Sequence, residues 1–88
     1  MSRQRSIEKI MASEYVTIGE LVRLTGSRYS TLKFYAEEQL LPFEQEEENL
    51  TRRFRRVDSI QRIEEIHGLR SEGKSIPEIK AYYSLASL

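Results

Sequence analysis

The chain has 88 residues, which fits one small domain with a modest hydrophobic core. Its 14 basic and 14 acidic side chains cancel, so the net charge gives no argument for a polyanionic partner. Cysteine is absent, which excludes disulfides and thiolate metal sites, and the single histidine leaves a zinc site short of ligands. Because no apolar run is long enough for a membrane span or a signal peptide, we expect a cytoplasmic protein without metal or cofactor.

The charges are unevenly distributed along the chain. Basic residues dominate positions 1–35 and again positions 51–62, whereas positions 36–50 contain glutamates and neither lysine nor arginine. Two basic zones therefore flank an acidic one, and only folding decides whether the basic zones share a face.

The first segments in chain order predict an N-terminal arm and a helix. Residues 1–14 are polar with apolar residues at helical spacing, which predicts an arm or a short amphipathic helix. Thr17 and Glu20 have the spacing of a capping box, and an apolar stripe follows them. We therefore expect a helix over 17–24 that stops at Gly26.

A second helix is expected over 28–38, with Ser27 as its cap. With Leu32 turned inward, the 100° step puts Tyr29, Tyr35 and Ala36 near the buried face. The residues expected to point away from this face are Ser30, Thr31, Lys33 and Phe34.

Residues 42–56 predict a hairpin of two short strands, with Phe43 and Phe54 as inward anchors. Its tip is expected at Glu47-Glu48-Asn49-Leu50. Alternation along the second strand puts Arg53 and Arg55 opposite Phe54, and Arg52 and Arg56 on the side of Phe54.

Two more helices are expected after the hairpin. Asp58 to Gln61 follow the capping-box logic and open a third helix, which Gly73 closes. Ser75 and Glu78 form another capping box, with Pro77 in the first turn of a fourth helix. The main domain is therefore expected over 15–85, followed by a tail at 86–88.

The order helix, tight turn, helix, basic hairpin, helix, helix predicts a mainly α fold with a small β-hairpin wing, a winged helix-turn-helix. The second helix of such a fold must be exposed on one side to enter the major groove, which is about 12 Å wide. The turn needs small residues, which Thr25, Gly26 and Ser27 provide, and the wing needs cations beside an apolar anchor. Arg52 to Arg56 with Phe54 provide that anchor and those cations.

Five pieces in the right order resemble the MerR family of DNA-binding regulators. Thr17 to Gly26 is similar to that family's first helix and turn, and Thr31-Leu32-Lys33-Phe34-Tyr35 to its recognition-helix motif. Leu40-Leu41-Pro42 is similar to the segment before its wing, and Asn49 to Phe54 to its wing strand. Its fourth-helix signature is matched by Gly73, Ser75, Glu78, Ile79 and Lys80.

The sequence also departs from the family pattern. Phe34 stands where the family often has a tyrosine, and Ser30 stands where it often has a basic residue. The tip of the wing is acidic. The family's long dimerisation helix and effector domain are not found within the 88 residues, so a natural minimal member and a fragment both stay open. We expect no small-molecule effector site in this chain and no metal sensing.

The resemblance implies sequence-specific binding of double-stranded DNA, with the helix at 28–38 in the major groove and the wing at 42–56 on the backbone or minor groove. Self-association on DNA, as a dimer or a tandem array, is expected. The candidate DNA-binding residues are Thr17, Arg28, Tyr29, Ser30, Thr31, Lys33, Tyr35, Arg52, Arg53 and Arg55.

Other functions stay open at this stage. The same fold serves architectural, excisionase-like and segregation factors, and a protein-interaction module that has lost DNA binding would fit the zero net charge. An enzyme is not expected, because no nucleophile–base pair, phosphate loop or metal motif is found.

Overall fold

The computed structural model describes residues 5–48 and 50–86; Asn49 of the expected hairpin tip and most of the expected tail at 86–88 lie outside this part. The described residues contain five helices and two short strands. In chain order they are α1 (Ile7–Ala12), β1 (Tyr15–Val16), α2 (Ile18–Thr25), α3 (Tyr29–Glu37), β2 (Phe54–Arg55), α4 (Arg56–Ser71) and α5 (Ile76–Ala86). The mainly helical fold with a small antiparallel β element, predicted from the sequence, is confirmed.

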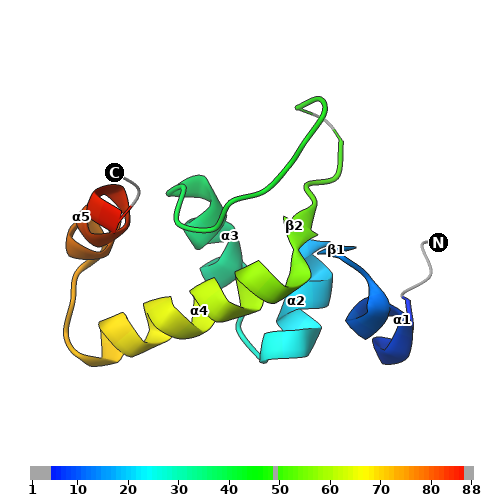
Figure 1. Ribbon diagram of the computed structural model, residues 1–88, viewed down its shortest axis with the longest axis horizontal. Coiled ribbons are helices and arrows are strands. Elements are labelled where there is room, and N and C mark those ends of the chain that lie inside the picture. Colours follow the sequence, from blue (N-terminus) through cyan, green and yellow to red (C-terminus); the bar gives the residue numbers. More distant parts are fainter. Residues whose placement is uncertain (1–4, 49, 87–88) are drawn as a thin grey trace.

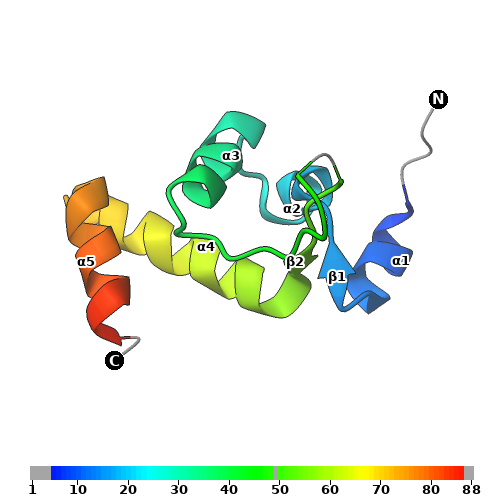
Figure 2. The ribbon, with the colours of Figure 1, turned by 90° about the horizontal axis from the view of Figure 1, so that it is seen from above.

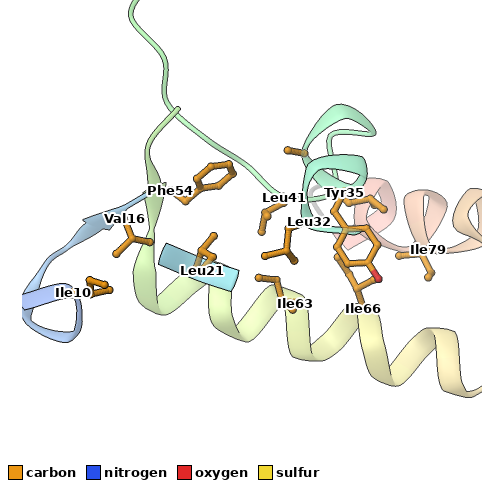
Figure 3. Close-up of a cluster of buried hydrophobic side chains, with 12 residues drawn as sticks. Ile10, Val16, Leu21, Leu32, Tyr35, Leu41, Phe54, Ile63, Ile66 and Ile79 are labelled. Atoms are coloured by element: carbon orange, nitrogen blue, oxygen red, sulfur yellow. The ribbon is translucent and has the colours of Figure 1, made fainter. Parts of the chain in front are cut away.

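The long helix α4 crosses the molecule, with α2 and α3 packed on it (Figure 1). Helices α1 and α5 lie at opposite ends of the longest axis, as both views show (Figures 1 and 2). The core is one cluster that follows α4 from end to end (Figure 3). Its members are Ile10, Val16, Leu21, Leu32, Tyr35, Ala36, Leu40, Leu41, Phe54, Ile63, Ile66 and Ile79.

The predicted ends of α2 are confirmed. The Glu20 amide donates to the Thr17 hydroxyl at 3.2 Å, and the Thr17 amide donates to the Glu20 carboxylate at 2.9 Å. Gly26 ends the helix with φ +72°, a left-handed conformation in which a side chain would be strained. The same cap at Ser75 and Glu78 opens α5 as predicted, with distances of 3.0 and 3.3 Å.

Two predicted helix caps are wrong. Helix α3 begins at Tyr29 with Arg28 at the cap position, because Ser27 is buried and its hydroxyl makes no hydrogen bond within the described residues. Helix α4 begins at Arg56, before Asp58, because β2 runs directly into it. The Arg56 amide donates to the Glu14 carbonyl at 2.9 Å, so the first turn does not depend on the Asp58 side chain.

The segment 42–56 differs from the predicted hairpin in its pairing. A single antiparallel bridge between Glu44 and Arg53 closes it, with both N–H···O distances at 2.8 Å. The strand β2 pairs instead with β1, Val16 opposite Phe54, which buries both side chains on one face. Phe43 and Phe54 are inward anchors as predicted, with ring centroids 5.6 Å apart.

The N-terminal segment, expected as an arm or a short helix, contains the six-residue helix α1, capped by Ser6. Two contacts fix it to the domain: Ile10 is fully buried, and the guanidinium of Arg5 donates to both carboxylate oxygens of Glu20 at 2.7 Å. These bonds from Arg5, together with the Thr17 amide bond, hold the pKa of Glu20 well below its usual range, at about 2.

We expect Glu20→Gln to destabilise the domain by about 1 kcal/mol at neutral pH, because it removes a charged hydrogen-bond acceptor from a half-exposed arginine. The pKa of Glu20 is depressed on folding, so its contribution is complete above the unfolded value of 4.5 and is lost as the pH falls towards 2. Urea unfolding of both proteins between pH 7 and 2.5 measures this. The difference should shrink below pH 4.5; Glu64→Gln, on an exposed face of α4, is the control.

Candidate nucleic-acid interface

The first turn of α3 is open to solvent. Arg28, Tyr29 and Ser30 are exposed, and Tyr29 retains 53% of its surface, so the prediction that it lies near the buried face is wrong. It is the first residue of the helix and precedes the part that packs through Leu32. Further along, Lys33 is exposed. This face thus presents two cations, a phenol and a hydroxyl without cover from the rest of the described chain.

Two other predicted DNA contacts occupy different surroundings. Tyr35 keeps only 5% of its surface and packs edge-on against His67, with ring centroids 6.2 Å apart. Burial raises the pKa of its hydroxyl. The Thr17 hydroxyl accepts the capping hydrogen bond of α2. Both side chains therefore have internal roles, and little of Tyr35 is left for a ligand.

Arg52 is tied into the fold at the base of the 42–53 loop. Its Nη1 donates to Glu37 Oε1 at 2.8 Å, and its guanidinium carbon lies 4.4 Å from the centroid of the Phe43 ring. Glu37 is the last residue of α3, so this ion pair joins the arginine-rich segment to the end of that helix.

Arg55 in β2 and Arg53, one residue before this strand, are both exposed on the side away from Phe54, as alternation predicts. Their guanidinium carbons lie 5.2 and 5.7 Å from the centroid of the Tyr15 ring. Arg55 also has a loose ion pair with Glu14, 3.8 Å between Nη1 and Oε1, and both side chains are more than half exposed. Arg56, expected on the side of Phe54, donates from Nε to the Ser13 carbonyl at 2.9 Å.

The cations at this surface are only partly neutralised. Within residues 5–48 and 50–86, Arg28, Lys33 and Arg53 make no ion pair. The acidic residues of the loop are exposed. Gln45 closes the loop, with its amide nitrogen 3.0 Å from the Glu48 carbonyl and 2.6 Å from the Leu50 carbonyl.

Helix α3 and the loop that leads to β2 lie on the same side of α4 in both views (Figures 1 and 2). The Arg52–Glu37 contact joins them directly. Sequence reasoning missed three side chains here: Tyr15, Glu37 and the stacking role of Phe43. Glu37 and Arg52 are far apart in the sequence, and no local spacing marks them as partners.

In the part of the chain that the structure describes, no group of three or more His, Asp or Glu side chains has the arrangement of a metal site. No described helix is long and apolar enough to cross a membrane.

A family model of the MerR HTH family regulatory proteins matches residues 16–85, most of the chain, and the fold has the elements that the resemblance implied. The chain belongs to the MerR family. No curated protein matches it, and no solved structure does. The family is one of DNA-binding regulators, so DNA is the partner of this MerR domain at the family level.

The region that matches the family leaves out the N-terminal part of the structure. It begins at Val16 and covers α2 to α5, including the exposed start of α3 and the arginine-rich segment. Helix α1 and Tyr15 precede it. In this MerR domain the guanidinium groups of Arg53 and Arg55 thus lie against a side chain outside the matched region.

Proposed function

We propose that this domain binds double-stranded DNA sequence-specifically and acts as a transcriptional regulator on the nucleoid, in the cytoplasm. The first turn of α3 enters the major groove, where Arg28, Tyr29, Ser30 and Thr31 read base edges. Lys33 contacts a phosphate, and Arg53 and Arg55 contact the adjacent backbone or minor groove. The supporting observation is the open first turn of α3, with an arginine that has no carboxylate partner among the described residues.

The distribution of paired and unpaired cations supports this arrangement, although the net charge of the chain is zero. Arg5, Arg52 and Lys80 are paired with carboxylates, whereas the cations at the start of α3 and on the sheet face are open or loosely paired. Phosphate contacts supply affinity and register, whereas base-edge contacts supply sequence preference. We therefore assign affinity to Lys33, Arg53 and Arg55, and specificity to the start of α3.

Arg52 takes a different role from the one first expected. Its hydrogen bond to Glu37 and its contact with the Phe43 ring fix the position of its guanidinium within the fold. We assign it to holding the arginine-rich segment against the end of α3, so that DNA meets both elements together.

Two copies are expected on adjacent half-sites about one helical turn apart. Architectural or segregation roles would appear as cooperative coating of repeated sites with DNA bending, instead of binding to one operator. The exposed acidic loop at 44–48 favours a second candidate, a protein-interaction module. Such a module would not shift DNA in gels even at low salt.

Selection of bound duplexes from a random DNA pool tests the proposal. The parent should enrich a defined motif. Arg28→Ala and Tyr29→Ala should relax the preference at one or two positions, with a loss of about 5- to 100-fold on the parent's motif. Arg53→Ala should weaken all sequences about equally. An unaltered motif in both α3 variants would contradict the assignment of base reading to this helix.

A further inference from the structure

The proposed function leaves one prominent side chain of the sheet without a role. Tyr15 lies in β1 directly opposite Arg55, one residue before the region that matches the family. Its neighbour Val16 faces the core, so Tyr15 faces outward, where it is half-buried.

Two arginines meet on the ring of Tyr15. Arg55 lies in β2, and Arg53 lies one residue before this strand, in the isolated bridge with Glu44; two residues apart in extended backbone, their side chains project to the same side. Their guanidinium carbons lie 5.2 and 5.7 Å from the centre of the phenol ring. Both distances are within the range of about 6 Å over which a cation is attracted to an aromatic face.

This arrangement leaves the arginines able to bind an anion. A guanidinium carries five N–H donors in a fork, and no hydrogen bond from the side chain of Arg53 or Arg55 is found within the described residues, so a contact with the ring leaves donors available. An arginine side chain also loses considerable rotamer freedom when it is fixed. A ring that restrains two arginines before the ligand arrives reduces the freedom lost on binding.

The neighbouring carboxylates do not occupy the guanidinium groups fully. The Tyr15 hydroxyl donates to Glu44 Oε1 at 3.3 Å, and among the described residues Glu44 makes no ion pair with the Arg53 side chain. Glu14 lies 3.8 Å from Arg55, but both are exposed, so water and salt weaken this pair.

We propose that Tyr15 is a positioning residue for DNA: its ring holds Arg53 and Arg55 together as a two-guanidinium site for backbone phosphates. This rests on the proposed function, because the phosphates are those of bound DNA. Tyr15 itself need not touch the ligand.

A double-mutant comparison tests this. Binding to a fluorescent mixed-sequence duplex of about 24 base pairs is measured at roughly 50 mM salt. Tyr15→Ile keeps a strand-forming apolar residue but removes the ring, and Tyr15→Phe keeps the ring but removes the bond to Glu44. We expect Tyr15→Ile to weaken binding about three- to tenfold, and Tyr15→Phe less than about twofold.

The same Tyr15→Ile change is then made in a chain with Arg53→Ala and Arg55→Ala. There it should cost less than about twofold, because no guanidinium is left to position. An equal loss with and without the arginines, or equal effects of Ile and Phe, would overturn the proposal. If the parent binds no DNA, the proposed function fails first; if the parent binds and Tyr15→Ile has no effect, only this inference fails.

A measurement on the free protein covers the case in which Tyr15→Ile unfolds. In the parent and in Tyr15→Phe, the ring current of residue 15 should shift the side-chain NMR signals of Arg53 and Arg55 away from the chemical shifts of arginine in an unfolded chain. Unperturbed arginine signals in both folded proteins would contradict the positioning role.

Discussion

Phe54→Ala is expected to destabilise the domain by about 3–5 kcal/mol, a large part of the roughly 5–15 kcal/mol by which folded domains are stable. Phe54 is fully buried, its ring meets Phe43 at 5.6 Å, and its backbone belongs to the strand that pairs with Val16. The change therefore leaves a cavity where the sheet, the 42–53 loop and α4 meet. Urea unfolding followed by circular dichroism measures the loss.

Two controls make this result specific. Val57→Ala alters a residue with 60% of its surface exposed in the first turn of α4, and should change the free energy of unfolding by about 0.5 kcal/mol or less. Phe54→Leu keeps most of the apolar volume and should fall between the two. A Phe54→Ala protein as stable as the Val57→Ala protein would mean that Phe54 does not anchor the segment.

The second large effect concerns DNA. Replacing Arg28, Lys33 and Arg53 with alanine should weaken binding by about 10²–10³-fold at roughly 50 mM salt. The slope of log affinity against log salt should fall by about two to three units, because fewer counterions are released. These three cations have no ion pair within the described residues, so their removal leaves no buried carboxylate unpaired.

A matched control separates this surface from net charge. Lys9→Ala, Arg70→Ala and Lys74→Ala together remove the same charge from exposed positions on α1, in the last turn of α4 and in the segment between α4 and α5. This variant should retain most of its affinity and of its salt slope. If both triple variants lose affinity equally, binding follows total charge and the proposed surface is wrong. Melting curves of both proteins establish that they are folded.

The parts of the fold that sequence predicts well are those with local causes. The caps at Thr17 and Ser75, the stop at Gly26 and the inward face of α3 at Leu32 all depend on residues within one or two turns. Their geometry follows from hydrogen bonds and spacing that any helix requires.

The parts that sequence misses depend on distant partners. The strand at Phe54 pairs with Val16, and a two-residue segment such as Tyr15–Val16 has too short a pattern to mark it as a strand. Alternation puts Arg52 and Arg53 on opposite sides of their segment, but it does not identify their partners: Glu37 forms an ion pair with Arg52, and Tyr15 lies beside Arg53. Sequence therefore predicts the side to which Arg53 and Arg55 point, but not the side chain that each arginine of this segment contacts.

The pairing of β1 with β2 also sets the order in which the molecule assembles. Its register joins Tyr15 to Arg55, about 40 positions along the chain, so this contact carries a larger loop-closure cost than any helix turn. On the ribosome, β2 meets its partner only once it has left the exit tunnel, and α2 and α3, at eight and nine residues, are too short to be stable before α4 follows and completes the core. A nascent chain halted before Phe54 therefore has neither the two-stranded sheet nor the core against which α3 packs.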